Sequence, residues 1–331
     1  MGRYILASLS VALSFTCLPV LARSSGNPDV LPFKIYGTQL IVVQGSIGSL
    51  EKRNLIIDTG AYPTVIDSAI AQKLSLSGHR EDLDALDQTL SAQAVTVPSI
   101  EVGPVHATFV QGLVQDLSEV SGRVGVRIDG LVGLDVLSFS SFVIDYGAKK
   151  ISFGAIDPLP SSVPFVMAKG KLCVDLQAGE NSLRLLVASS AERIVLLRSH
   201  VPWIPDSDRA RAFASLGGSS VMKEVRLDGL QIGDTLLNTD PVYLATRDLR
   251  IHSFDGFLST IQFRQVAFDF ERKRFGWMTK ADQRDRVHVT SKQKDTPPFA
   301  SALARQLTKG KEATSIPAPC GVSREKVCSL Q

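Results

Sequence analysis

The 331-residue sequence contains few of the residues on which metal-binding and nucleic-acid-binding proteins depend. It has four cysteines but no paired CxxC and no HExxH motif, which excludes the common zinc-site patterns. The five histidines are scattered, with no spacing that gathers them into a metal site. Acids and bases are interspersed, the net charge is +3, and no basic stripe with aromatics crosses the body of the chain. We therefore expect no metal, no cofactor and no nucleic acid.

Long hydrophobic runs are also scarce, since the sequence has one near its start and none later that is long enough to span a bilayer. This run follows Arg3, extends from Ile5 to Leu21 with polar interruptions and Pro19, and ends beside the small residue Ala22. The pattern is typical of a signal peptide over residues 1–22, with a membrane anchor as the alternative. We expect export to the periplasm or the extracellular space, with no integral span after cleavage.

Cysteines are few in the remaining chain as well. Without residues 1–22, the sequence has Cys173 inside an apolar strand pattern, and Cys320 with Cys328 near the end. An exported chain could join Cys320 to Cys328 and leave Cys173 buried and inert, but the sequence leaves this disulfide open. Because Lys, Arg, Ser, Thr and Pro dominate from Lys280 onward, we expect residues 280–331 to form a basic, disordered tail.

Short apolar runs rich in β-branched residues dominate the body of the chain, and Gly, Pro, Asn or charged residues separate them. We therefore predict a mainly β protein with two short helices in its first half, Ser68–Leu74 and Asp82–Leu90. The predicted strands of that half are Leu40–Val43, Leu55–Ile57, Ala94–Val97, His106–Val110, Phe142–Ile144 and Ile151–Phe153.

The most informative stretch is Leu55–Asp67, with the sequence LIIDTGAYPTVID. An apolar strand runs directly into Asp58, and a carboxylate at the end of a core strand is costly unless hydrogen bonds hold it. Gly60 allows a sharp backbone turn beneath the acid, and Thr59 is suited to bond neighbouring main chain. The stretch therefore predicts a structural or chemical role for Asp58.

The stretch resembles the active-site loop of the aspartic proteases, whose Asp-Thr-Gly-Ala signature stands here at residues 58–61. Two later segments extend the resemblance in the same order: GLVGLDVL at Gly130–Leu137 and FVIDYGAKKISF at Phe142–Phe153. The pattern is most similar to the small retroviral, or retropepsin-like, type. The resemblance implies that Asp58 is catalytic, that Thr59, Gly60 and Ala61 support it, and that Gly133 lies under the turn.

The family also has a hairpin that covers the substrate, and the resemblance implies that it falls between Asp84 and Val97. This stretch has no Gly at a plausible tip, which departs from the family pattern. Tyr62 and Pro63, which follow the motif, are equally compatible with the border of a substrate pocket and with an ordinary turn.

A comparison of the chain with itself shows that residues 163–277 repeat residues 31–153 in order and with nearly constant spacing. We therefore predict a tandem repeat of two retropepsin- or pepsin-like β-barrel lobes, at residues 31–158 and 163–279. The matching pairs are Pro32-Phe33 with Pro164-Phe165, Val102-Gly103 with Ile232-Gly233, Asp129–Gly133 with Asp255–Ser259, Val143–Tyr146 with Ala267–Phe270, and Ile151–Phe153 with Phe275–Trp277.

The second lobe lacks an acid at the matching position. The alignment puts Ala188 opposite Asp58, with Ser189 opposite Thr59 and Ser190 opposite Gly60. In the family, two close carboxyl groups share one proton, the ionised group takes a proton from water, and the neutral group bonds the peptide carbonyl. A lone Asp58 lacks the partner that raises its pKa, so we expect it to stay ionised.

Three hypotheses follow. The first is an exported endopeptidase that pairs Asp58 with a second Asp58 in a homodimer and cuts peptide or protein substrates. The second is a catalytically inactive pseudoprotease that binds peptides or envelope partners in the cleft between its lobes. The third is a structural protein of the cell envelope in which Asp58 is a satisfied polar group beneath the turn.

Four further aspartates end strands beside turn residues, where carboxylates commonly bond backbone N–H groups. Because they recur in both halves, we predict that they are structural rather than catalytic. They are Asp129, Asp145, Asp255 and Asp269.

Overall fold

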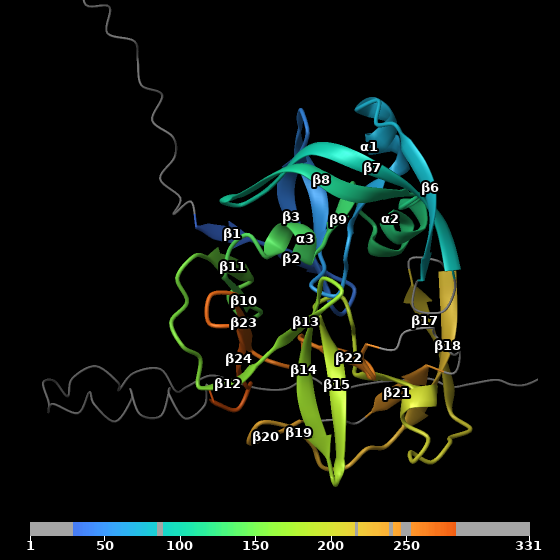
Figure 1. Cartoon of the computed structure of the whole chain (residues 1–331), viewed down its shortest axis with the longest axis vertical. Helices are drawn as coiled ribbons and strands as arrows, with labels where there is room; N and C mark the ends of the chain where they lie inside the picture. The colour runs from blue at the N-terminus through green and yellow to red at the C-terminus, as the bar shows by residue number, and fades with distance from the viewer. Residues whose placement is uncertain (1–28, 85–88, 216–217, 238–240, 246–252, 283–331) are drawn as a thin grey trace, which may run out of the picture. The chain divides into compact units, whose positions relative to one another are not determined.

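The structure, a computed structural model, describes residues 29–84, 89–215, 218–237, 241–245 and 253–282 (Figure 1). Strands far outnumber helices in these ranges, which confirms the predicted mainly β class. No helix within them is long and apolar enough to cross a membrane. The predictions for residues 1–22, for the tail beyond residue 282 and for the pairing of Cys320 with Cys328 lie outside the described residues.

An eight-stranded sheet contains most of the first half, in the order β2-β3-β4-β9-β5-β8-β7-β6. Its central strands are short runs of Ile, Val and Leu, which favour a pleated, buried surface. Three short helices accompany the sheet: α1 (Ser68–Lys73), α2 (Ser118–Val124) and α3 (Leu134–Leu137). The strands are β2 (Lys34–Tyr36), β3 (Leu40–Ile47), β4 (Leu50–Ile57), β5 (Thr64–Asp67), β6 (Gly78–Asp84), β7 (Thr89–Val102), β8 (Val105–Gln115) and β9 (Gly130–Val132).

A second sheet of ten strands contains most of the second half, in the order β17-β18-β21-β16-β22-β15-β14-β19-β20, with β13 paired to β14. A short 3-10 helix, Arg198–His200, follows β16. The strands are β13 (Val166–Ala168), β14 (Lys171–Ala178), β15 (Asn181–Ala188), β16 (Val195–Leu197), β17 (Ala210–Ser215), β18 (Gly218–Val225), β19 (Leu230–Ile232), β20 (Thr235–Leu236), β21 (Val242–Ala245) and β22 (Gly256–Ser259).

A six-stranded sheet joins the halves, because β10 of the first half pairs antiparallel with β23 of the second. At this junction Phe142 lies opposite Phe268, and their rings stack with centroids 4.7 Å apart. One continuous hydrophobic core includes residues of both halves. The sheet order is β1-β11-β10-β23-β24-β12, with β1 (Val30–Pro32), β10 (Phe142–Asp145), β11 (Lys150–Phe153), β12 (Ser161–Pro164), β23 (Gln265–Asp269) and β24 (Arg274–Met278).

The two halves use the same pairing around their central strands. In the first, β4 runs parallel to β9 with Leu55 beside Gly130, and β5 pairs antiparallel with β9. In the second, β15 runs parallel to β22 with Leu185 beside Gly256, and β16 pairs antiparallel with β22. These pairs coincide with the alignment of the chain with itself. A tandem duplication as the origin of this match stays a prediction.

The helix predicted at Ser68–Leu74 is present as α1, and Leu74 caps its C terminus. The helix predicted at Asp82–Leu90 is wrong, because β6 extends to Asp84 and pairs antiparallel with β7 from Thr89 onward. A short stretch with mixed polar and apolar residues suits either structure locally, and strand pairing decides between them. The hairpin implied between Asp84 and Val97 is thus part of the longer β6–β7 hairpin, and residues 85–88 lie outside the described residues.

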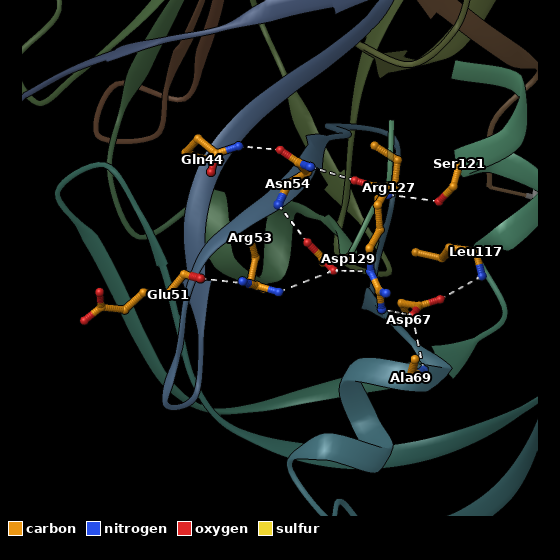
Figure 2. Close-up of polar contacts among 11 residues, drawn as sticks. Gln44, Glu51, Arg53, Asn54, Asp67, Ala69, Leu117, Ser121, Arg127 and Asp129 are labelled. Atoms are coloured by element: carbon orange, nitrogen blue, oxygen red, sulfur yellow. Dashed lines mark hydrogen bonds and ion pairs between the residues drawn. The ribbon is translucent and has the colours of Figure 1, made fainter. Parts of the chain in front are cut away.

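The predicted structural role of the repeated aspartates is confirmed by their contacts with backbone N–H groups. Figure 2 shows the first of them, Asp129, which accepts hydrogen bonds from the Asn54 backbone at 3.0 Å and from Arg127 Nε at 2.9 Å. Nearby, Asp67 accepts bonds from the backbone N–H groups of Ala69 and Leu117, both at 3.1 Å. These carboxylates fix strand ends and the start of α1.

Candidate active site

The strand β4 ends directly at Asp58, whose backbone N–H donates to the carbonyl of Val132 at 3.0 Å. This bond continues the parallel pairing of β4 with β9 by one residue. The apolar run that the sequence placed before the acid is therefore a core strand, and Asp58 itself is 8% exposed. Asp58 therefore lies at the edge of the hydrophobic core, and its backbone is held by strand pairing.

The carboxyl group of Asp58 has two hydrogen-bond donors. The backbone N–H of Gly60 donates to its Oδ1 atom at 2.9 Å, and the hydroxyl of Ser190, from the second lobe, donates to it as well. Burial raises the pKa of Asp58, and the bonds from Ser190 and Gly60 and the charge of Lys171 oppose that rise. The sequence traced a raised pKa of Asp58 only to a second acid, whereas burial raises this pKa here without one.

The loops of the two lobes are joined by a reciprocal exchange between Thr59 and Ser189. The hydroxyl of Thr59 donates to the Val187 carbonyl at 2.9 Å, and the hydroxyl of Ser189 donates to the Ile57 carbonyl at 2.9 Å. Each hydroxyl also accepts the backbone N–H of the other residue at 3.0 Å. Both residues are 0% exposed, so these four bonds are satisfied without water. Thr59 and Ser189, which the alignment of the two halves matches, are thus in direct contact within one chain.

Ala188 lies where the second acid of an aspartic protease is expected. A Cβ added to Gly60 would be 2.9 Å from the Ala188 Cβ, so the two loops touch at this point. Ala188 is buried and pairs with Ser259 on β22. The described residues around Asp58 therefore bring together Ala188, Ser189 and Ser190, but they bring no second carboxyl group to the acid.

Gly133 lies under the turn, as the resemblance implies. A Cβ on Gly133 would be 2.6 Å from the Ala61 carbonyl oxygen, and the next residue, Leu134, donates its N–H to that oxygen at 3.1 Å. A side chain would therefore displace the loop that carries Asp58. At the matching position of the second lobe Ser259 is accommodated, and its hydroxyl donates to the Ala191 carbonyl at 2.7 Å.

Sequence reasoning missed two residues that act on this site. Asp135 accepts bonds from the backbone N–H and the hydroxyl of Thr64, at 2.9 and 2.7 Å, and so holds the far end of the Asp58 loop. Burial raises its pKa, against these two bonds. Lys171, at the start of β14, is the other, since its charge reaches Asp58 from the second lobe. The position of Asp135, an acid two residues after Gly133, was a usable signal in the sequence. Nothing in the sequence pattern points to Lys171.

Tyr62 borders the site on the first lobe and is 48% exposed. A Cβ added to Gly170 would be 2.5 Å from the Tyr62 ring, so this ring lies directly on a turn of the second lobe. The ring thus forms part of the contact between the lobes and also offers an exposed apolar edge. Both alternatives that the sequence left open for Tyr62 are compatible with this position.

No cluster of three or more metal-ligating side chains occurs among the residues that the structure describes. Cys173 is buried and free, and burial raises the pKa of its thiol to about 11. The prediction of a buried cysteine at this position is confirmed.

The structure thus brings together an acid at the end of a core strand, a Thr–Ser exchange between two loops and Gly133 beneath the turn, with one carboxyl group at the centre. In agreement, residues 43–136 match the family model described as Aspartyl protease. The matched range includes Asp58 and Gly133 and lies within the first lobe. No curated protein matches the chain.

Proposed function

We propose that this protein binds extended peptides at the Asp58 centre and does not hydrolyse them by the two-carboxyl mechanism. The single observation that carries the proposal is the contact of Asp58's loop with Ala188 of the same chain. A shared proton requires two carboxyl groups within hydrogen-bond reach, and a methyl group neither donates nor accepts one. The family match in the first lobe supports a peptide as the ligand.

The homodimer hypothesis gains no support from this geometry. To bring a second Asp58 to the centre, another chain would have to replace the second lobe at Thr59. That replacement would break four buried hydrogen bonds: two between Thr59 and Ser189, one from Thr59 to Val187, and one from Ser189 to Ile57. It would also open the pairing of β10 with β23. Buried groups that lose their partners cost about 1–3 kcal/mol each, so the separated state is unfavourable.

Export to the periplasm or the extracellular space is part of the proposal, and it rests on the pattern of residues 1–22. A peptide or protein of that compartment is then the partner. The half-buried Ser190 and the exposed Tyr62 flank Asp58, which supports access of such a ligand to the centre.

The experiment that tests the proposal restores the missing acid. We expect wild-type protein to bind capped peptides without cutting them, and the double variant Ala188→Asp/Ser190→Gly to gain endopeptidase activity at about pH 3–6. Adding Asp58→Asn to the double variant should abolish this activity. The matched control, Ala188→Asn/Ser190→Gly, has nearly the same shape and no new acid, so it should remain inactive.

Two outcomes would contradict the proposal. Cleavage by wild-type protein that Asp58→Asn removes would favour the endopeptidase hypothesis instead. A folded wild-type protein that retains no peptide from a random capped library would favour the structural hypothesis.

A further inference from the structure

The loop of the second lobe at the centre follows the same course as the loop that carries Asp58. Thr59 and Ser189 exchange equivalent hydrogen bonds at the start of the two loops. Two residues later, the carbonyl groups of Ala61 and Ala191 each accept a hydrogen bond from the segment at the end of β9 or β22. The next residue of each loop therefore lies at an equivalent place, on opposite sides of the centre.

At this place the two lobes present different residues. The first lobe has Tyr62 after Ala61, and the second has Glu192 after Ala191. Glu192 is half-buried, and within the described part of the chain its carboxylate has no hydrogen bond or ion pair. The following residue, Arg193, is exposed, so solvent screens its charge. A carboxylate that loses water without gaining a partner is destabilising, and a cation of a ligand would offset that cost.

The side of the centre that carries Glu192 is also the more open one. On the other side, the ring of Tyr62 lies on the β13–β14 turn, 2.5 Å from a Cβ added to Gly170. The corresponding turn of the first lobe joins β2 to β3 and includes Gly37. A Cβ added to Gly37 would have only Gln39 Oε1, an atom of the same turn, at 4.0 Å. No described residue of the second lobe covers Gly37 in this way, so this side is accessible to a ligand.

We propose that the peptide bound at the Asp58 centre carries a basic residue, and that the Glu192 carboxylate binds its Lys or Arg side chain. This inference rests on the proposed function. Asp58 already has donors in Gly60 and Ser190 and is 8% exposed, so Glu192 is the more available carboxylate. A cation that covers Glu192 forms charge-assisted hydrogen bonds in a partly dehydrated place, where such bonds are stronger than in water.

The net charge of the protein would act in the opposite sense. The chain carries a net charge of +3, so general electrostatic attraction favours acidic peptides. A preference for basic peptides must therefore come from a local carboxylate. We expect the bond to Glu192 to change affinity about tenfold, as is typical of a hydrogen bond to a charged group.

The test uses two libraries of capped peptides with randomised flanks, in which the central residue is Lys in one and Gln in the other. Binding to the full-length protein is measured at neutral pH by retention and by fluorescence anisotropy. We expect wild-type protein to prefer the Lys library about tenfold. Glu192→Gln should remove this preference while the Gln library still binds, and Glu192→Asp should keep part of it.

The matched control is Glu180→Gln, which removes an exposed carboxylate from the turn between β14 and β15 of the same lobe. This control should leave the preference unchanged. Equal retention of both libraries by wild-type protein, an unchanged preference in Glu192→Gln, or an equal loss in Glu180→Gln overturns this inference while the proposed function stands. Failure of both libraries to bind overturns the proposed function itself.

Discussion

Thr59 and Ser189 lie 130 positions apart in the chain, and the backbone N–H of each donates to the hydroxyl of the other. Each hydroxyl in turn donates to a carbonyl two residues before the other residue, that of Val187 or Ile57. The valine in Thr59→Val has a similar shape but no hydroxyl, so the Val187 carbonyl and the Ser189 N–H would be left buried without partners. We expect a loss of about 2–6 kcal/mol in the free energy of unfolding, from two unsatisfied groups. Urea unfolding measures it.

The control for this variant is Thr96→Val, which removes an exposed hydroxyl that bonds Gln111 on the surface. Its effect should stay within about 0.5 kcal/mol. A double-mutant cycle of Thr59→Val with Ser189→Ala should give a clear coupling energy, because both changes remove members of one network. Additive effects would contradict a direct exchange between the lobes.

The pKa of Asp58 links stability to pH. Because burial raises this pKa in the folded state, the folded protein holds the proton more tightly than the unfolded chain. Below the unfolded pKa of about 3.9, the titration of Asp58 therefore does not lower the free energy of unfolding. As pH rises above that value, this free energy falls until the carboxyl group of the folded protein has ionised. We expect Asp58→Asn to raise the melting temperature at pH 7 and to leave it nearly unchanged at about pH 3.5.

Differential scanning calorimetry of both proteins across this pH range makes the measurement. The control is Asp116→Asn, whose exposed carboxyl group has a pKa lowered by bonds to Ser118. This variant should show no increase in melting temperature at pH 7. A gain for Asp58→Asn that persists at acid pH would contradict ionisation as its cause.

Gly133 is the position at which a small change should damage the site most. In Gly133→Ala the new methyl group would meet the Ala61 carbonyl at 2.6 Å, and the backbone must shift to relieve that contact. We expect a loss of about 1–3 kcal/mol in unfolding free energy, as for other overpacked sites. Gly122→Ala is the control, because nothing lies within 4 Å of the added methyl group in α2. It should stabilise the protein by about 0.5–1 kcal/mol.

Cys173 should resist chemical modification in the folded protein. Burial excludes reagents, and a thiol pKa of about 11 leaves little thiolate at neutral pH. Iodoacetamide labelling followed by peptide mass spectrometry should find the peptide of Cys173 unlabelled in native protein and fully labelled in urea. Rapid native labelling at a rate that matches the unfolded chain would contradict the buried position.

The sequence alone could predict the parts of this protein that depend on local pattern and order. The apolar run into Asp58, the small residue at Gly133 and the absence of an acid at Ala188 all follow from aligned strands, and the observed pairing uses the same register. The prediction of a helix at Asp82–Leu90 is wrong because the local pattern is ambiguous and the pairing of β6 with β7 decides the structure.

The rest of the site depends on distant segments that meet only in the folded chain. The raised pKa of Asp58 comes from burial in which the second lobe takes part, and Ser190 and Lys171 reach the acid across 113 or more positions of sequence. No spacing rule relates such residues, because their proximity results from the joining of β10 to β23.

A complex of identical subunits presents every side chain twice, once from each copy, so a substitution always alters both walls of a shared centre. In this protein the two walls are encoded separately, as the threonine at position 59 and the serine at position 189 demonstrate. A substitution at position 189 then leaves the residues of the acid-bearing loop unchanged. One polypeptide can thus place different residues on the two sides of a single carboxyl group, which a symmetric pair cannot do.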